Sequence, residues 1–128
     1  MMGSAALFCV LSLLEAVAGI ALDDSNIYTA RDAWLSDSAA AEVTYGHIST
    51  WETGGVTDMK NLFCGYECDG SSWCSDCNSA AASFNEDISA WDTSGVTRMY
   101  GMFWGASSFN QNIGGWEVGN VNEMGQMF

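Results

Sequence analysis

One pattern of apolar and polar positions recurs along the second half of the chain. Residues 84–103 and 109–128 share the same residue at eight positions, each displaced by 25 residues with no gap, and residues 48–63 form a third, partial copy. A fixed period between about 20 and 50 residues indicates stacked repeats, in which neighbouring copies cover each other's apolar side chains. The predicted repeat core is Ile48, Trp51, Val56, Met59, Phe63, Phe84, Ile88, Trp91, Val96, Met99, Phe103, Phe109, Ile113, Trp116, Val121, Met124 and Phe128.

The spacing inside each copy predicts a short extended segment, a turn and a short helix. Between Val96 and Phe103 the apolar residues fall at i, i+3, i+6 and i+7, which places them on one face of a helix. Asp58 and Glu123 would lie in the first helical turn, where the helix dipole favours acidic residues, whereas Arg98 does not fit this pattern. The sequence therefore predicts a repeat solenoid over residues 47–128.

Residues 22–46 precede the repeats and predict a pair of helices. Ser25 is a candidate N-cap for a helix ending near Leu35, and Asp37 with Ser38 offers a second cap before a helix that stops at Gly46. A solenoid needs an atypical terminal unit to cover its first open face. We expect this pair of helices to form that N-terminal cap, and a separate binding helix is the alternative.

Residues 1–21 resemble a cleaved signal peptide. A ten-residue apolar run ends at Leu14, and Ala18 and Ala21 each complete a small-residue cleavage site. The run is short for a membrane span and Glu15 interrupts it, although a retained anchor and a buried helix remain alternatives. We therefore expect a secreted or cell-surface protein that has lost Cys9 with its signal and has no membrane span after cleavage.

The segment 64–80 interrupts the period with four cysteines, spaced C-x3-C-x5-C-x2-C. They are Cys64, Cys68, Cys74 and Cys77. Four close thiolates could bind zinc, or serve a redox role. Structural zinc sites usually separate two cysteine pairs by a dozen or more residues, and cysteines in an exported protein usually become disulfides. The sequence favours two disulfides, with three pairings open.

The repeat resembles that of a known family. The pattern F-N-x-[DN]-I-x-x-W-[DE]-x-x-x-V-x-x-M-x-x-M-F is similar to the 25-residue repeat of the BspA-like surface proteins, a leucine-rich-repeat-like family also catalogued as a domain of unknown function. The resemblance covers residues 44–128. It implies a leucine-rich-repeat-like solenoid, a surface location and a role in binding or adhesion to a protein or surface glycan. It supplies no catalytic residue.

Charge and motif content narrow the function further. The net charge is −13 with only three basic residues, so no basic patch is available for nucleic acid or an anionic membrane. His47 is the only histidine, and no nucleophile–carboxylate arrangement is evident near it in the sequence. We predict no enzyme activity, cofactor or metal site. The leading hypothesis is an interaction or adhesion module, and the alternative is a small Cys-rich metal or redox module on a repeat scaffold.

The last copy, 109–128, carries the full apolar set rather than a polar outer face. Terminal repeats normally have a polar outer face. The sequence therefore predicts a fragment of a longer array, with self-association through this copy and fraying of its last coil as the alternatives.

Overall fold

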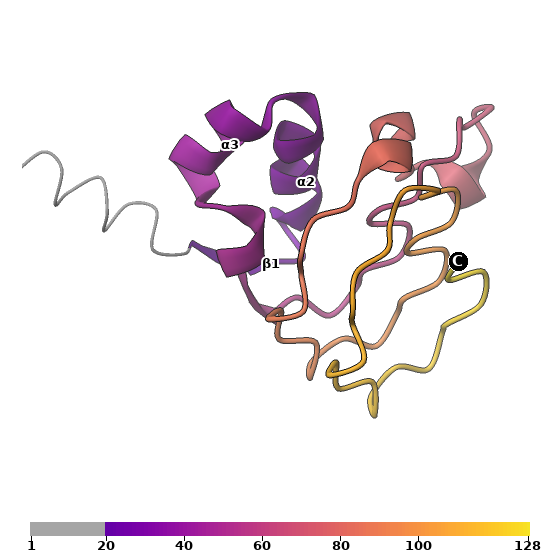
Figure 1. Ribbon diagram of the computed structural model, residues 1–128. Coiled ribbons are helices and arrows are strands. Elements are labelled where there is room, and N and C mark those ends of the chain that lie inside the picture. The colour runs from indigo at the N-terminus through magenta and orange to yellow at the C-terminus, as the bar shows by residue number, and fades with distance from the viewer. Residues whose placement is uncertain (1–19) are drawn as a thin grey trace, which may run out of the picture.

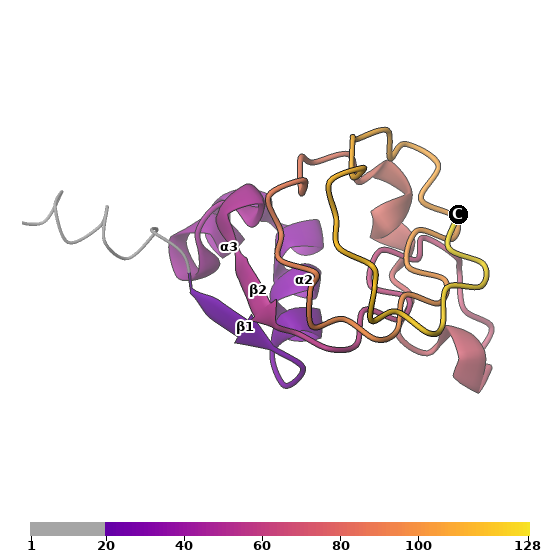
Figure 2. The ribbon, with the colours of Figure 1, turned by 90° about the horizontal axis from the view of Figure 1, so that it is seen from below.

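Two helices and a two-stranded parallel sheet lead into a series of stacked turns (Figure 1). The computed structural model describes residues 20–128. Residues 1–19 of the predicted signal peptide lie outside this range. The helices and strands are β1 (Ala21–Asp23), α2 (Ile27–Ser36), α3 (Ser38–Tyr45) and β2 (Glu52–Gly55), and short 3-10 turns cover Ile48–Thr50, Ser72–Cys74 and Ser79–Ser83. Figure 2 shows β1 alongside β2, with Ala21 opposite Glu52.

Helices α2 and α3 form where the sequence predicts them. Asp37 caps α3 by accepting a hydrogen bond from the backbone N–H of Ala40 at 3.2 Å, and Gly46 ends α3 with a φ of 77° that favours glycine. Ser25 does not cap α2. Asn26 occupies that position, and Ser25 instead donates to the carboxylate of Asp23.

The predicted helix in each copy is absent. Asn61, Gly101 and Gln126 hold equivalent positions in the three copies, and their φ values are 57°, 62° and 54°. An α-helix needs a negative φ at every residue, so a left-handed residue at this position stops a helix from forming. In the first two copies the repeated apolar side chains still lie in the core, although the backbone that carries them forms turns instead of a helix.

The backbone of each copy forms hydrogen bonds with the next copy in addition to the bonds within its own turns. Three N–H groups of the first copy (48–63) donate to carbonyls of the second copy (84–103), and three of the second donate to the third (109–128), at 2.7–2.9 Å. The donor–acceptor pairs are Met59–Arg98, Asn61–Tyr100, Phe63–Met102, Met99–Glu123, Gly101–Gly125 and Phe103–Met127.

These lateral bonds replace the predicted strand-plus-helix unit. Within residues 20–128 the regular elements are two helices, three short 3-10 turns and one open two-stranded sheet, and no copy contains an α-helix. The predicted leucine-rich-repeat-like solenoid is therefore wrong. The i, i+3, i+6, i+7 spacing that suggested a helix is equally compatible with inward-pointing residues on a turn.

Helix α2 covers the first copy with polar as well as apolar groups. The carbonyls of Lys60 and Leu62 are equivalent to those of Tyr100 and Met102, which accept N–H donors from the preceding copy. In the first copy the Tyr28 hydroxyl donates to the Lys60 carbonyl at 2.5 Å, and the Arg31 guanidinium donates to the Leu62 carbonyl at 2.6 Å. The two side chains thus replace the backbone donors of a preceding copy.

Arg98 belongs to a row of charges that crosses the copies. Its guanidinium lies 2.9 Å from the carboxylate of Asp58 in the first copy and 2.8 Å from that of Glu123 in the third. The three residues are paired in register by isolated parallel bridges. Opposite charges facing each other across neighbouring strands stabilise the pairing, so the basic residue fits a cross-copy ladder and not a helix N-terminus.

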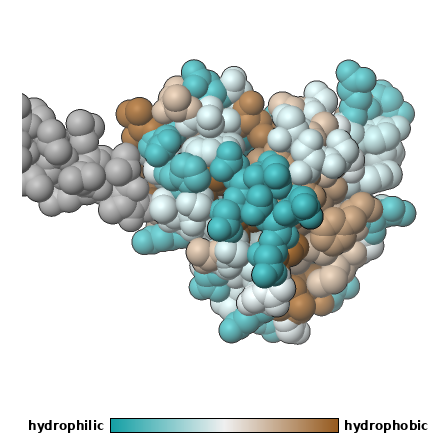
Figure 3. All heavy atoms as spheres, in the orientation of Figure 1, coloured by the Kyte–Doolittle hydropathy of each residue, from teal (hydrophilic) through white to brown (hydrophobic). Residues whose placement is uncertain are grey.

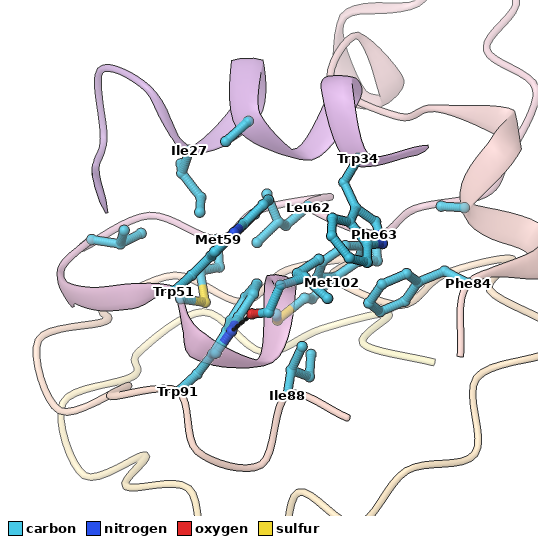
Figure 4. Close-up of a cluster of buried hydrophobic side chains, with 14 of the residues drawn as sticks. Ile27, Trp34, Trp51, Met59, Leu62, Phe63, Phe84, Ile88, Trp91 and Met102 are labelled. Carbon is cyan, nitrogen blue, oxygen red and sulfur yellow. Dashed lines mark hydrogen bonds between the residues drawn. The ribbon is translucent and has the colours of Figure 1, made fainter. Parts of the chain in front are cut away.

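Aromatic side chains form the centre of the core (Figure 4). The Trp91 ring stacks on Trp51 with centroids 6.0 Å apart, and its indole N–H donates to the Ile48 carbonyl at 2.8 Å. Trp116 repeats this bond one copy later, to the Ile88 carbonyl at 3.1 Å. Trp91 and Trp51 are each 3% exposed, so they share the lowest exposure among the described tryptophans.

Replacing Trp91 should test this core. We expect Trp91→Ala to lower the free energy of unfolding by about 3–5 kcal/mol, because it removes a buried ring and leaves a core carbonyl without its donor. Trp73→Ala removes a partly exposed ring and should cost much less. A chemical-denaturant titration of both variants measures the difference, and the reverse order would contradict the packing described above.

Candidate functional site

Two disulfides shape the insert between the first and second copies. Cys64 pairs with Cys77, with Cα atoms 4.7 Å apart, and Cys68 pairs with Cys74, with Cα atoms 5.4 Å apart. The predicted disulfides are thus confirmed, and of the three pairings the structure has the nested one. Cys64 and Cys74 are buried, whereas Cys68 is exposed. The two bridges hold this short irregular segment in one shape.

The disulfide pairing also argues against the alternative of a zinc site in the insert. In the described part of the chain, one group of three side chains has metal-ligand atoms within 4.8 Å of one another, namely Cys68, Asp69 and Cys74. Two of its three ligand atoms are sulfurs of one disulfide. Structural zinc sites use thiolates, so the oxidised insert does not fit a zinc site.

Three aromatic side chains gather at the base of the insert. We call Tyr66, Trp73 and Trp104 the aromatic cluster. Tyr66 stacks on Trp104 with centroids 5.5 Å apart, and Trp73 lies 4.8 Å from Trp104 and 5.3 Å from Tyr66. Tyr66 is 43% exposed, and the two tryptophans are partly exposed.

Close backbone packing brings the aromatic cluster together. The N–H of Gly65 donates to the Trp104 carbonyl at 2.8 Å. A Cβ at Gly65 would lie 2.6 Å from the carbonyl oxygen of Gly105, so only glycine allows this approach. The Asn61 side chain donates to the Trp73 carbonyl at 2.7 Å and fixes the third ring. The sequence singled out Trp73 and Trp104 as lying outside the repeat pattern, but it gave no sign that they meet.

Acidic groups lie on the same insert as Tyr66 and Trp73. Glu67 and Asp69 are exposed, and Asp76 is partly exposed. Ser71, through its side chain and then its backbone N–H, holds the pKa of the Asp69 carboxyl below its ordinary value, so this carboxylate is charged at neutral pH. Figure 3 shows hydrophilic surface at the upper right, where Figure 1 places the insert.

The third copy exposes side chains that the first two copies bury. Met124 is 41% exposed and Phe128 is 73% exposed, whereas Met99 and Phe103 are 0% and 2% exposed. Figure 3 shows hydrophobic surface near the C-terminus marked in Figure 1. Of the predicted core residues in this copy, Trp116 is buried at 8%, and three are half-buried, namely Phe109, Ile113 and Val121.

The predicted core residues of the other two copies lie inside. All of them are at most 4% exposed, and they are Ile48, Trp51, Val56, Met59, Phe63, Phe84, Ile88, Trp91, Val96, Met99 and Phe103. Leu62 and Met102 join them at 0%. Burial is thus complete in the first two copies and partial in the third.

His47 has neighbours that the sequence did not predict. Its Nδ1 lies 2.8 Å from the Ser49 hydroxyl, and its Nε2 lies 3.8 Å from the Glu86 carboxylate. Nδ1 also accepts the Ser49 backbone N–H at 3.2 Å, so the ring caps the 3-10 turn that follows it. The distance to Glu86 exceeds that of a hydrogen bond, and both side chains are about 40% exposed. This geometry suits a turn cap better than a catalytic triad.

An open groove of about 400 Å³ lies along the turns of the first two copies. Its lining includes Glu52 and Asp92, both exposed. The Asp92 carboxylate accepts hydrogen bonds from the hydroxyl and the backbone N–H of Ser94, which lower its pKa. The groove therefore offers exposed carboxylates without an aromatic surface, because its one tryptophan, Trp51, is buried.

Comparison with known proteins places this chain in a family. A family model described as "Mycoplasma protein of unknown function, DUF285" matches residues 35–128, which contain all three copies and the insert. The chain belongs to the DUF285 family. No curated protein and no solved structure matches. Neither a BspA nor a leucine-rich-repeat family matches, so the assignment suggested by the sequence pattern is corrected to DUF285.

Membership of DUF285 assigns no activity, so the function must be argued from the surfaces. Over residues 20–128 no helix is both long enough and apolar enough to span a membrane. The aromatic cluster and the apolar side of the third copy are the two surfaces whose exposed residues differ most from an ordinary polar surface.

Removing each disulfide of this DUF285 protein should cost a measurable part of its stability. We expect Cys64→Ser with Cys77→Ser to lower the free energy of unfolding by about 3 kcal/mol, and Cys68→Ser with Cys74→Ser by about 2 kcal/mol, because the longer loop gains more entropy on unfolding. Denaturant titrations without reductant measure both. Thiol titration of the native chain without its first 18 residues should find almost no free thiol. A finding of four reactive thiols together with bound zinc would contradict the two disulfides described here.

Proposed function

We propose that this DUF285 chain is an exported, non-enzymatic interaction module of the adhesion type. The observation that carries the proposal is the difference in burial between equivalent residues. Phe128 is 73% exposed, and its equivalents Phe63 and Phe103 are 0% and 2% exposed. Large exposed apolar side chains mark contact surfaces, so the third copy is a surface that either a further repeat or another protein chain covers.

The backbone of the third copy supports the same proposal. In the first and second copies, N–H groups at three alternate positions donate to the next copy. The equivalent groups of the third copy belong to Met124, Gln126 and Phe128, and no acceptor within residues 20–128 receives them. Exposed backbone donors in a row are a template for another chain. The bound partner therefore meets both an apolar face and a line of hydrogen-bond donors.

Export is supported by the chemistry of the chain. Structural disulfides such as these two are typical of oxidising compartments, for example the cell surface, and are rare in the cytosol. The apolar run with small-residue cleavage sites provides the route. An acidic surface with a net charge of −13 keeps an exported protein soluble and gives nucleic acid no basic patch to bind.

The alternative of a metal or redox module has less support. Its thiols are paired, and Cys74 and Cys64 are buried, which limits access for thiol exchange. An interaction role needs neither free thiols nor a metal.

Self-association should depend on the third copy. We expect the chain from residue 19 onward to sediment as a dimer or larger species at tens of micromolar. Met124→Gln with Phe128→Gln should shift it to monomer, because both exposed apolar side chains become polar. Val43→Gln is the matched control, since Val43 is 69% exposed on α3. A monomeric native chain, or equal loss of association in the control, would contradict self-association through this face.

The cleavage site should lie after Ala18. Cleavage there leaves β1 complete, whereas cleavage after Ala21 removes the residue that pairs with Glu52. We expect the intact mass of protein exported from its native host to correspond to a chain that begins at Gly19. A mass that includes Met1 would argue against export by a cleaved signal.

A further inference from the structure

The aromatic cluster is not explained by the repeat. Trp104 follows Phe103 at the position that Cys64 holds after Phe63, and Tyr66 and Trp73 lie in the insert. The three rings touch one another on the outside of the molecule rather than in the core. An exposed group of large aromatic side chains, fixed by disulfides and by Gly65, resembles a preformed binding surface, because little conformational entropy would be lost on binding.

The indole N–H groups of the cluster differ from those of the three tryptophans that recur in the repeat. The core indoles of Trp51, Trp91 and Trp116 each donate to a backbone carbonyl. The indoles of Trp73 and Trp104 donate to no acceptor in the described residues, and both side chains reach solvent. They can therefore donate to carbonyl oxygens of a ligand.

The charge around the cluster has one sign. Glu67, Asp69 and Asp76 lie on the insert, and the sequence has no Lys or Arg between Lys60 and Arg98. Arg98 is paired with two carboxylates on the row of charges described above, and Arg31 is buried. The insert thus combines ring faces with carboxylates and contains no Lys or Arg.

We propose that the aromatic cluster binds an arginine-containing peptide segment of a partner protein. A guanidinium group stacks on the faces of Trp and Tyr rings through cation–π and planar contacts, which an ammonium group makes less well. The carboxylates of Glu67 and Asp69 pair with the same cation, and the free indole N–H groups bond to peptide carbonyls. The site shares no residue with the exposed face of the third copy and does not depend on the function proposed for that face.

A matched pair of labelled peptides tests the proposal. The probes are a fluorescein-labelled Gly-Arg-Gly-Arg-Gly peptide and the same peptide with citrulline for arginine, which keeps the shape and removes the charge. Fluorescence anisotropy with the disulfide-bonded chain should show about tenfold tighter binding of the arginine peptide, and its affinity should fall as salt is raised. Equal binding of the two peptides, or binding of a neutral oligosaccharide in preference to both, would overturn the proposal.

Paired variants locate the site. Trp104→Leu should weaken binding of the arginine peptide by about tenfold, whereas Trp104→Phe keeps a ring and should retain most of it. Glu67→Gln with Asp69→Asn should weaken binding severalfold. Glu52→Gln with Asp92→Asn makes the same charge change in the groove, away from the cluster, and should leave binding within about twofold of the unmodified chain.

Two outcomes would count against the site. One is a Trp104→Leu variant that keeps its disulfides yet binds like the unmodified chain. The other is an equal loss of binding in the two acidic double variants, which would show attraction to the overall charge. If the Trp104→Leu variant does not form its disulfides, the test rests on the two acidic double variants and on the comparison of the arginine peptide with the citrulline peptide. The double substitution Met124→Gln with Phe128→Gln, which makes the exposed face of the third copy polar, should leave binding of the arginine peptide unchanged.

Discussion

The structure depends on lateral hydrogen bonds between the backbones of neighbouring copies. A buried N–H or C=O group without a partner is costly, and the bonds inside each turn leave further groups to be satisfied by a neighbouring copy. In the six lateral bonds described above, each copy presents carbonyls to the copy before it and N–H groups to the copy after it, whereas the N–H groups of Thr97 and Asn122 donate to the copy before. This polarity gives the stack two chemically different ends. The first end needs donors, which Tyr28 and Arg31 of α2 supply, and the other end displays donors of its own.

The lateral bonds also explain which polar residues recur. The hydroxyls of Thr53 and Thr93 donate to carbonyls of the following copy, and the Asn85 side chain accepts the backbone N–H of Asn110 at 2.8 Å. The repeated tryptophans pack as apolar rings and also donate to a carbonyl of the segment before them. A repeated residue in this protein is thus usually one that serves the neighbouring copy, either by packing or by a hydrogen bond.

The sequence predicted the period, the two helices and the disulfides, because each rests on a local signal. It could not predict the backbone path of a copy. Apolar residues at i, i+3, i+6 and i+7 suit a helix as well as a turn. Asn61 and Gly101 are residue types that tolerate a positive φ, but Gln126 at the equivalent position of the third copy is not, so the signal is not consistent across the copies. Arg98 was the one residue at odds with a helix, and its pairing with Asp58 and Glu123 reveals the cross-copy register. The aromatic cluster could not be predicted from the sequence either, because Tyr66 contacts Trp104 only when the first and second copies pair in this register.

The two exposed surfaces respond to different conditions, because they are stabilised by different parts of the molecule. Both disulfides close within the insert, over separations of 13 and 6 residues, and neither joins two copies. Reduction would therefore release the acidic loop and Trp73 while leaving the lateral bonds between residues 59–63 and 98–102 in place. The apolar face of the third copy depends on those lateral bonds and on the Phe103–Phe128 stack, with centroids 5.5 Å apart. A reducing environment should thus loosen the aromatic cluster first, and the third copy can keep its surface without it.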